Sequence, residues 1–245
     1  MHKIRWTPEK VAKFWNFYAN NPVYERTYFS YHAGKYLLRY LVRKIPGFMD
    51  LKNILDFGCG VGFLIKHFIS LYKREAKKDV KIYGLEFSKD AVDRVNDRFS
   101  SFDIFGKALY VEKLPSNFNN DFFDLITLVE VLEHLNDKEL YETIKEAYRL
   151  LRVGGFIVVT VPNEEDLELN EVICPECGCV FHRWQHVRSW STKSLREFME
   201  SNGFVTFHLA TCFLGDVYSL IAFEVERILR RNLKYPKVIY IGGKR

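Results

Sequence analysis

Three glycines at every second position close an apolar run in the stretch Ile54-Leu55-Asp56-Phe57-Gly58-Cys59-Gly60-Val61-Gly62. Residues 63–72, which follow, have the apolar spacing of a helix. The pattern predicts a buried strand, a tight glycine turn and a helix. Glycine allows positive φ and lets a ligand lie against bare main chain, and a helix N-terminus offers free N–H groups to an anion. The stretch therefore predicts a turn that binds a nucleotide-like cofactor.

The spacing of the glycines narrows the choice of cofactor. A dinucleotide-binding turn, G-x-G-x-x-G, would have its third glycine at position 63, which is Phe63, whereas this chain has Gly62. With an acid ahead of it, the turn resembles motif I of the class I S-adenosylmethionine (SAM) dependent methyltransferases. The resemblance implies that the methionine part of SAM is surrounded by Asp56, Gly58, Cys59, Gly60 and Gly62.

Further motifs in chain order extend the resemblance over residues 50–165. A second strand, 80–86, ends in Glu86, where a carboxylate can accept both ribose hydroxyls, and Phe87 is expected to lie against the adenine. Residues 150–156, LLRVGGF, predict a helix end, a glycine turn and the start of a strand, as in the family.

One position departs from the family's pattern. Ahead of Leu114-Pro115 the family often has an acid that contacts the adenine amino group, and this chain has Tyr110 there. Backbone groups or Glu112 are expected to take that role, or the adenine sits differently.

Strands and helices alternate along the chain, which predicts an α/β fold with helices on both faces of a mostly parallel sheet. The resemblance implies a Rossmann-like class I methyltransferase fold with seven strands, the last one antiparallel. We expect a helical lid at 1–50 and a SAM-binding domain at 51–245, with a zinc-knuckle-like insertion at about 170–190. The strands are predicted at 52–57, 80–86, 108–111, 123–129, 156–161, 204–211 and 238–241. The lid candidates are Tyr28, Phe29 and His32, with simple packing on the sheet as the alternative for each.

Two carboxylates and an imidazole follow the strand at 123–129, in the run Val129-Glu130-Val131-Leu132-Glu133-His134-Leu135. If this run is a helical turn, Glu130, Glu133 and His134 share one face and can hold a divalent cation. The E-x-x-E-H run resembles quinone-biosynthesis O-methyltransferases and small-RNA 2′-O-methyltransferases, where it implies a metal near the acceptor oxygen. We therefore take these three residues as catalytic, and Glu130 also as a cofactor contact. A metal-free alternative stays open, with His134 orienting the substrate or acting as a base.

A second cluster contains the spacing C-x2-C-x4-H-x3-H. Two thiolates and two imidazoles suit a tetrahedral structural zinc, which predicts Cys174, Cys177, His182 and His186 as ligands. Cys179 is a substitute for either histidine, and free cysteines or a redox pair are the alternatives. His186 could instead join the Glu130, Glu133 and His134 site. Trp184 and Arg183, with the two histidines, are also candidates for substrate contacts.

Length and composition limit the number of domains and the class of protein that the chain can be. The chain of 245 residues suits one α/β domain with additions, and 48% hydrophobic residues can build a large core. A net charge of +5, spread along the chain, does not imply nucleic acid, and no signal peptide or membrane span is evident, so a cytoplasmic protein is expected.

Three functions fit these observations. The first is methyl transfer to an oxygen, or else a nitrogen, of a small molecule. The others are an RNA or protein methyltransferase, and a SAM-binding protein without activity.

Overall fold

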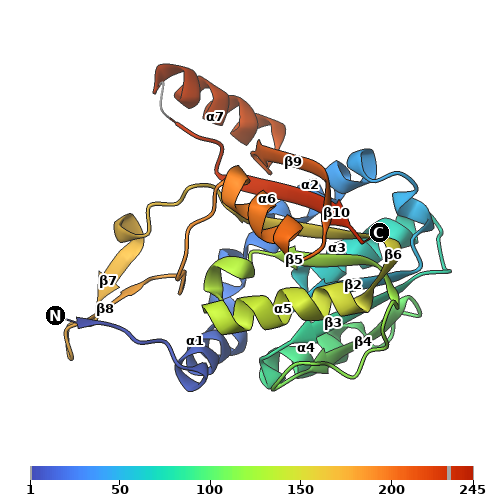
Figure 1. Ribbon diagram of the computed structural model, residues 1–245, viewed down its shortest axis with the longest axis horizontal. Coiled ribbons are helices and arrows are strands. Elements are labelled where there is room, and N and C mark those ends of the chain that lie inside the picture. Colours follow the sequence, from blue (N-terminus) through green and yellow to red (C-terminus); the bar gives the residue numbers. More distant parts are fainter. Residues whose placement is uncertain (1, 231–232, 245) are drawn as a thin grey trace.

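The computed structural model describes residues 2–230 and 233–244, and a seven-stranded sheet forms its centre (Figure 1). The strand order is β4-β3-β2-β5-β6-β10-β9. Strands β2 to β6 are parallel, and β10 is antiparallel to both of its neighbours. The bounds are β2 (Asn53–Phe57), β3 (Lys81–Glu86), β4 (Phe105–Tyr110), β5 (Phe123–Val129), β6 (Leu151–Pro162), β9 (Val205–Cys212) and β10 (Lys237–Gly243). The predicted mostly parallel seven-stranded sheet and its antiparallel last strand are confirmed.

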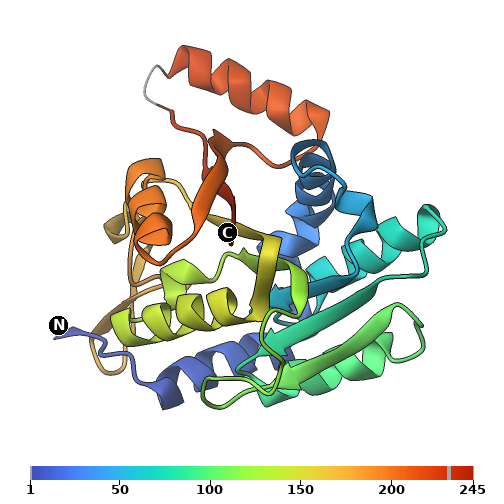
Figure 2. The ribbon, with the colours of Figure 1, turned by 45° about the vertical axis from the view of Figure 1, so that its right-hand side comes forward.

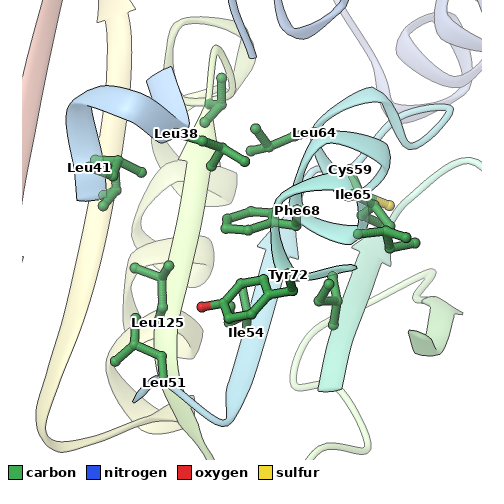
Figure 3. Close-up of a cluster of buried hydrophobic side chains, with 14 of the residues drawn as sticks. Leu38, Leu41, Leu51, Ile54, Cys59, Leu64, Ile65, Phe68, Tyr72 and Leu125 are labelled. Carbon is green, nitrogen blue, oxygen red and sulfur yellow. The ribbon is translucent and has the colours of Figure 1, made fainter. Parts of the chain in front are cut away.

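Helices cover both faces of this sheet, as predicted (Figures 1 and 2). They are α1 (Pro8–Asn20), α2 (Phe29–Lys44), α3 (Phe63–Arg74), α4 (Lys89–Phe99), α5 (Asp137–Leu150) and α6 (Thr192–Ser201). Helix α7 (Val217–Leu229) has no buried residue and projects away from the sheet. One apolar layer joins α2, α3 and α4 to the sheet, and a second joins α5 and α6 to the opposite face. In the first layer, Phe68 and Tyr72 of α3 lie against Ile54 of β2 (Figure 3), and the Tyr72 hydroxyl donates to the Phe48 carbonyl at 2.9 Å.

Local signals explain where several helices begin. Thr7 caps α1 by accepting from the Lys10 N–H, and Pro8 occupies the first turn, where a missing N–H costs nothing. Asn136 and Glu139 form a capping box at the start of α5.

The prediction of a glycine turn within residues 150–156 is wrong. Helix α5 ends at Leu150, and β6 begins at the next residue, so no separate turn intervenes. Gly154, at φ +74°, lies inside the strand, where the pairing with β5 shifts register. The glycine therefore serves an irregular strand, which a one-dimensional pattern does not distinguish from a turn.

The insertion forms a small sheet of its own, which the sequence did not predict. Strand β8 (Cys179–His182) lies between β7 (Glu171–Ile173) and the N-terminal strand β1 (His2–Lys3). Figure 1 shows this small sheet at the side of the molecule beyond α1. The described residues also include the short 3-10 helices η1 (Pro22–Thr27), η2 (Phe48–Asp50), η3 (Leu132–His134) and η4 (Glu168–Asn170). In the described part of the chain, every helix is too short or too polar to span a bilayer.

Candidate active site

The glycine turn lies at the carboxyl end of β2, between the ends of β3 and β5. Its three glycines have φ values of +79° at Gly58, +49° at Gly60 and +84° at Gly62. The N–H of Gly58 donates to the Leu85 carbonyl at 2.8 Å. A methyl group added at Gly58 would lie 2.6 Å from Cγ2 of Val131. The turn therefore requires glycine and touches the segment that carries the Glu133 and His134 side chains.

Glu86 is held at the tip of β3 by main-chain donors. Its carboxylate accepts from the N–H groups of Gly60 at 2.8 Å, Phe87 at 2.7 Å and Ser88 at 3.1 Å. Burial raises its pKa, and these three donors lower it. A carboxylate at this point, beside bare glycine main chain, fits the ribose of the expected cofactor.

The N-terminal segment covers this end of the sheet. A methyl group added at Gly60 would lie 3.3 Å from Cε1 of Tyr28, whose ring packs on Phe63 at 5.7 Å between centroids. Phe29 lies under the ammonium of Lys237 at 4.7 Å, while His32 is exposed and bonds the Arg26 carbonyl. Of the three lid candidates, Tyr28 lies directly over the glycine turn.

Asp56 lies beneath the glycine turn, only 3% exposed. It accepts from the Thr127 hydroxyl at 2.8 Å. Burial raises the pKa of its carboxyl from 3.8 to about 7, and the charge of Glu86 adds to the rise. Asp56 thus joins β2 to β5 in the layer below the cofactor turn.

This burial predicts a pH dependence of stability. A carboxyl whose folded-state pKa is raised stabilises the folded state most at low pH, and that contribution falls as pH rises from about 4 to about 7. Asp56→Asn is expected to abolish the fall, so the variant gains stability over the wild type by up to about 4 kcal/mol at neutral pH. Urea unfolding at pH 4, 5.5 and 7.5 measures the difference, with the exposed Asp97→Asn as control. An equal difference at all three pH values would contradict the assignment.

A buried cluster of carboxylates and imidazoles lies next to the turn. Glu133 and His134 come from η3, Glu165 from the loop after β6, and His182 and His186 from the insertion. Two groups of ligand-type atoms have all members within 4.8 Å of one another: Glu133, His134 and His186, and then Glu165, His182 and His186. The ring of His186 lies 4.8 Å from that of His134 and 4.4 Å from that of His182.

Among the described residues, several polar atoms of this cluster are buried without a hydrogen-bond partner. They are both carboxylate oxygens of Glu133 and Nδ1 of His134. Burial, followed by the charge of Glu130, raises the pKa of Glu133 well above its usual range. Burial, followed by His186, lowers the pKa of His134 to about 3. Unpaired buried polar atoms are costly, so their convergence points to a bound ion or ligand.

The hydrogen bonds assign distinct roles to the two insertion histidines. Nδ1 of His186 lies 2.5 Å from Oε2 of Glu165. When this Nδ1 carries the proton and donates it to Glu165, the other ring nitrogen of His186, Nε2, has a free lone pair. Nδ1 of His182 accepts the N–H groups of Trp184 and His186, so its Nε2 carries the proton and faces Oε1 of Glu165 at 3.3 Å. This arrangement leaves His186 with a nitrogen able to bind an ion, and His182 lies behind the carboxylate that orients the His186 ring.

The prediction that Glu130 shares a helical face with Glu133 and His134 is wrong. Glu130 has φ +54°, and the 3-10 turn begins two residues later, at Leu132. Its carboxylate accepts from the Thr160 hydroxyl at 2.9 Å and forms an ion pair with Lys237. A lysine already neutralises this carboxylate, so Glu130 belongs to the ion pair and lies outside both ligand groups.

The four predicted zinc ligands do not come together either. His182 and His186 lie with Glu165, while Cys174 and Cys177 lie at the tip of the β7–β8 hairpin and belong to neither group. The alternative expects His186 to join Glu130, Glu133 and His134. The structure brings His186 to Glu133 and His134 but leaves Glu130 outside the group.

Four residues of the site escaped the sequence prediction. Trp15 of α1 packs on His134 at 4.9 Å and donates to Gln185, whose amide donates to the His134 carbonyl at 2.8 Å. Glu165 and Lys237 complete the cluster. Both flank strand ends at the same edge of the sheet as the glycine turn, a position that the strand alternation could have revealed.

Comparison with known proteins agrees with this geometry. Residues 27–209, about three quarters of the chain, match a family described as a methyltransferase domain. The chain is 26% identical over 146 residues to a tRNA N(3)-methylcytidine methyltransferase of Schizosaccharomyces pombe, covering 54% of this chain and 46% of that protein. It is 26% identical over 162 residues to a 2-methyl-6-phytyl-1,4-hydroquinone methyltransferase of Synechocystis, covering 65% of this chain and 48% of that protein. The chain thus spans about half the length of these curated relatives.

A solved structure supports the same fold. A methyltransferase in complex with the Haloferax volcanii Trm112 activator superposes with a TM-score of 0.65 at 17% identity, over 94% of this chain and 97% of that one. The match of the family model, the sheet order and the cofactor turn lead to one conclusion: the chain belongs to the methyltransferase domain family, and its domain is of the SAM-dependent kind.

Proposed function

We propose that this protein transfers a methyl group from SAM to an oxygen of a small-molecule acceptor, at a centre formed by Glu133, His134 and His186. The observation that carries the proposal is the set of unpartnered buried donor atoms beside the glycine turn. Val131, which touches Gly58, joins the two parts of the site. SAM supplies an activated methyl group, so the protein has to orient the acceptor, exclude water and allow the acceptor hydroxyl to lose its proton.

The donor set fits a divalent cation. One carboxylate and two imidazoles, with a second carboxylate behind one imidazole, are ligands that divalent transition metals and zinc accept. The low pKa of His134 keeps its imidazole neutral, as a ligand must be. A bound ion would supply Lewis-acid polarisation of the acceptor oxygen.

The remaining residues exclude water and hold the centre in place. Trp15 covers His134, and Gln185 ties the Trp15 ring and the His134 main chain together. At the next position of helix α1, Asn16 accepts from the Ser88 hydroxyl at 2.6 Å, and the N–H of Ser88 donates to Glu86. The same helix therefore reaches both the cofactor end and the acceptor end of the site.

The carboxylate of Glu165, which bonds the ring of His186, offers a test of the proposed centre. Glu165→Gln is expected to weaken metal binding by about 10- to 100-fold, because Gln holds the His186 ring but provides no charge behind it. Isothermal titration with Mn²⁺ or Zn²⁺ measures the change, and the exposed Glu168→Gln in η4 is the matched control. Unchanged affinity in Glu165→Gln would show that Glu165 does not support the ligand.

A second candidate acceptor is RNA, and one observation favours it. A groove of about 600 Å³ between α2, α3 and the segment before α7 is lined by Tyr31, Tyr36, Phe63, Lys35 and Lys66, among others. Aromatic rings and lysines together suit a single-stranded nucleic acid. The tRNA relative acts on RNA, while the hydroquinone relative acts on a phenolic compound.

Methyl-labelled SAM distinguishes these functions. The purified chain would be incubated with a panel of hydroquinones and phenols, and separately with total tRNA, before and after chelation and metal return. The proposal expects label in a small-molecule ether, with transfer lost on chelation and restored by metal. Label in RNA alone would favour the second candidate. SAM binding without transfer to either panel would contradict both.

A further inference from the structure

The tip of the β7–β8 hairpin is a tight turn that carries two cysteines, Cys174 and Cys177. Gly178, at φ +67°, closes the turn by donating to the Cys174 carbonyl at 2.9 Å. Cysteine thiolates are ligands that zinc accepts, and a C-x2-C turn of this kind is a common half of a zinc site.

The strand register places two further donors beside this turn. Cys174 donates its N–H to the Cys179 carbonyl at 2.8 Å, and the pairing of β7 with β8 sets these two residues opposite each other. On the other side of β8, His2 of β1 is the direct partner of Cys179. Directly paired residues project to the same face of a sheet, about 5 Å apart. Cys174, Cys179 and His2 therefore form one row across the three strands.

The same alternation explains why His182 lies elsewhere. It is three residues beyond Cys179 in β8, so the two side chains point to opposite faces. The face of His182 also carries Lys3 and Glu171, which form an ion pair at 2.8 Å. The opposite face carries Phe181, which packs on Trp6 at 6.3 Å. The cysteines and the Glu/His cluster thus occupy different sides of the hairpin.

We propose that Cys174, Cys177, Cys179 and His2 form a structural zinc site, separate from the Glu133, His134 and His186 centre. Three thiolates and one imidazole are a complete tetrahedral ligand set for zinc. Compared with the ligands predicted from the sequence, Cys179 and His2 take the places of His182 and His186. The pairing of the three strands sets Cys179 and His2 beside Cys174.

The proposed site requires its four side chains to turn toward one another. The four donors are not among the groups within 4.8 Å of one another, but the main chain already sets the row in register. His2 and Cys177 are exposed and free to turn toward the Cys174 and Cys179 sulfurs.

Zinc at this position would tie the N-terminal strand to the insertion. Strand β1 leads directly into α1, which carries Trp15 to His134, and β8 carries His182 to Glu165. The site would therefore hold together, from outside, the two segments that enclose the candidate active site.

Metal analysis of the full chain, purified without a histidine tag, tests the proposal. We expect one zinc per chain that a thiol-blocking mercurial releases and that is lost in Cys174→Ser, Cys177→Ser and Cys179→Ser. His2→Gln is expected to lose zinc to a chelator that the wild type withstands. Cys212→Ser and Glu133→Gln are the controls and should keep this zinc. Cobalt substitution should give a thiolate-to-metal charge-transfer band in the wild type and in Glu133→Gln.

Three results would overturn the proposal. One is a wild-type chain that takes up no thiolate-bound metal. Another is zinc retained in Cys179→Ser and His2→Gln but lost in His182→Gln. The third is a disulfide between Cys174 and Cys179 under reducing purification. Because a cysteine variant could misfold, circular dichroism and SAM binding are measured on each, and His2→Gln, at an exposed position, gives an independent reading. Failure here leaves the proposed methyl transfer untouched, since that centre uses other ligands.

Discussion

Replacing Glu133 by glutamine is expected to lower the rate of methyl transfer about a thousandfold and, at the same time, to stabilise the metal-free protein. The side chain is fully buried, and neither of its oxygens has a partner. Loss of this ligand removes the polarising cation, which contributes several kcal/mol to such reactions. Because burial raises the pKa of the Glu133 carboxyl, the metal-free fold keeps this group either as a desolvated charge or with a proton taken up from solution, and glutamine removes that cost.

Two measurements on Glu133→Gln separate the effects. Initial rates with saturating metal and SAM report the chemistry, and thermal unfolding in the presence of chelator reports the stability. The exposed Glu197→Gln in α6 is the control for a lost carboxylate. A variant that loses activity and stability together would indicate a structural role, and one that keeps full activity would remove Glu133 from the centre.

Gly58→Ala is expected to weaken SAM binding about 100-fold and to destabilise the fold by about 2–3 kcal/mol. Positive φ alone costs an alanine roughly 1–2 kcal/mol. The added methyl group would also lie 2.6 Å from Val131, so the turn or the segment before Glu133 has to move. Either movement changes the main chain on which the cofactor lies.

A second substitution separates the cost of the positive φ at position 58 from the cost of the contact with Val131. Gly58→Ala combined with Val131→Ala should recover the part of the affinity that the contact removes, while the cost of positive φ remains. Gly154→Ala is the matched control, because Gly154 also has a positive φ, of +74° against +79° at Gly58. A methyl group at Gly154 would meet only the Arg152 side chain, at 3.5 Å. Calorimetric titration with SAM and urea unfolding measure both quantities. Equal losses in the single and double variants would rule out the Val131 contact as the cause.

The cofactor half of the site could be predicted from the sequence because it depends on local backbone. The turn at Gly58, Gly60 and Gly62 has positive φ at all three glycines, and Glu86 ends its strand at the same edge of the sheet. Glycine spacing and the end of an apolar run are signals within a few residues of the groups they position. The alternation of strands and helices could be predicted for the same reason, since each element has its own local pattern, whereas the seven strands and the antiparallel last one were expected from the resemblance to the family.

The half of the site proposed to bind the methyl acceptor, around Glu133 and His134, could not be predicted from local patterns in the sequence. The E-x-x-E-H run predicted one shared face, but Glu130 adopts φ +54° and pairs with Lys237, which is 107 residues away. The residues that take its place, Glu165 and His186, come from separate loops. No helical period relates them, so only long-range packing brings them together.

The sequence by itself determined the fold class, the cofactor turn and the presence of ligand-type residues, because these depend on short-range patterns of burial and backbone freedom. The tertiary structure decided which ligands meet. The pairing of β1, β7 and β8 turns Cys174, Cys179 and His2 to one face and His182 to the other, where Glu165 and His186 lie. Strand register is set by hydrogen bonding between distant segments, and it alone divided one run of cysteines and histidines between two places in the molecule.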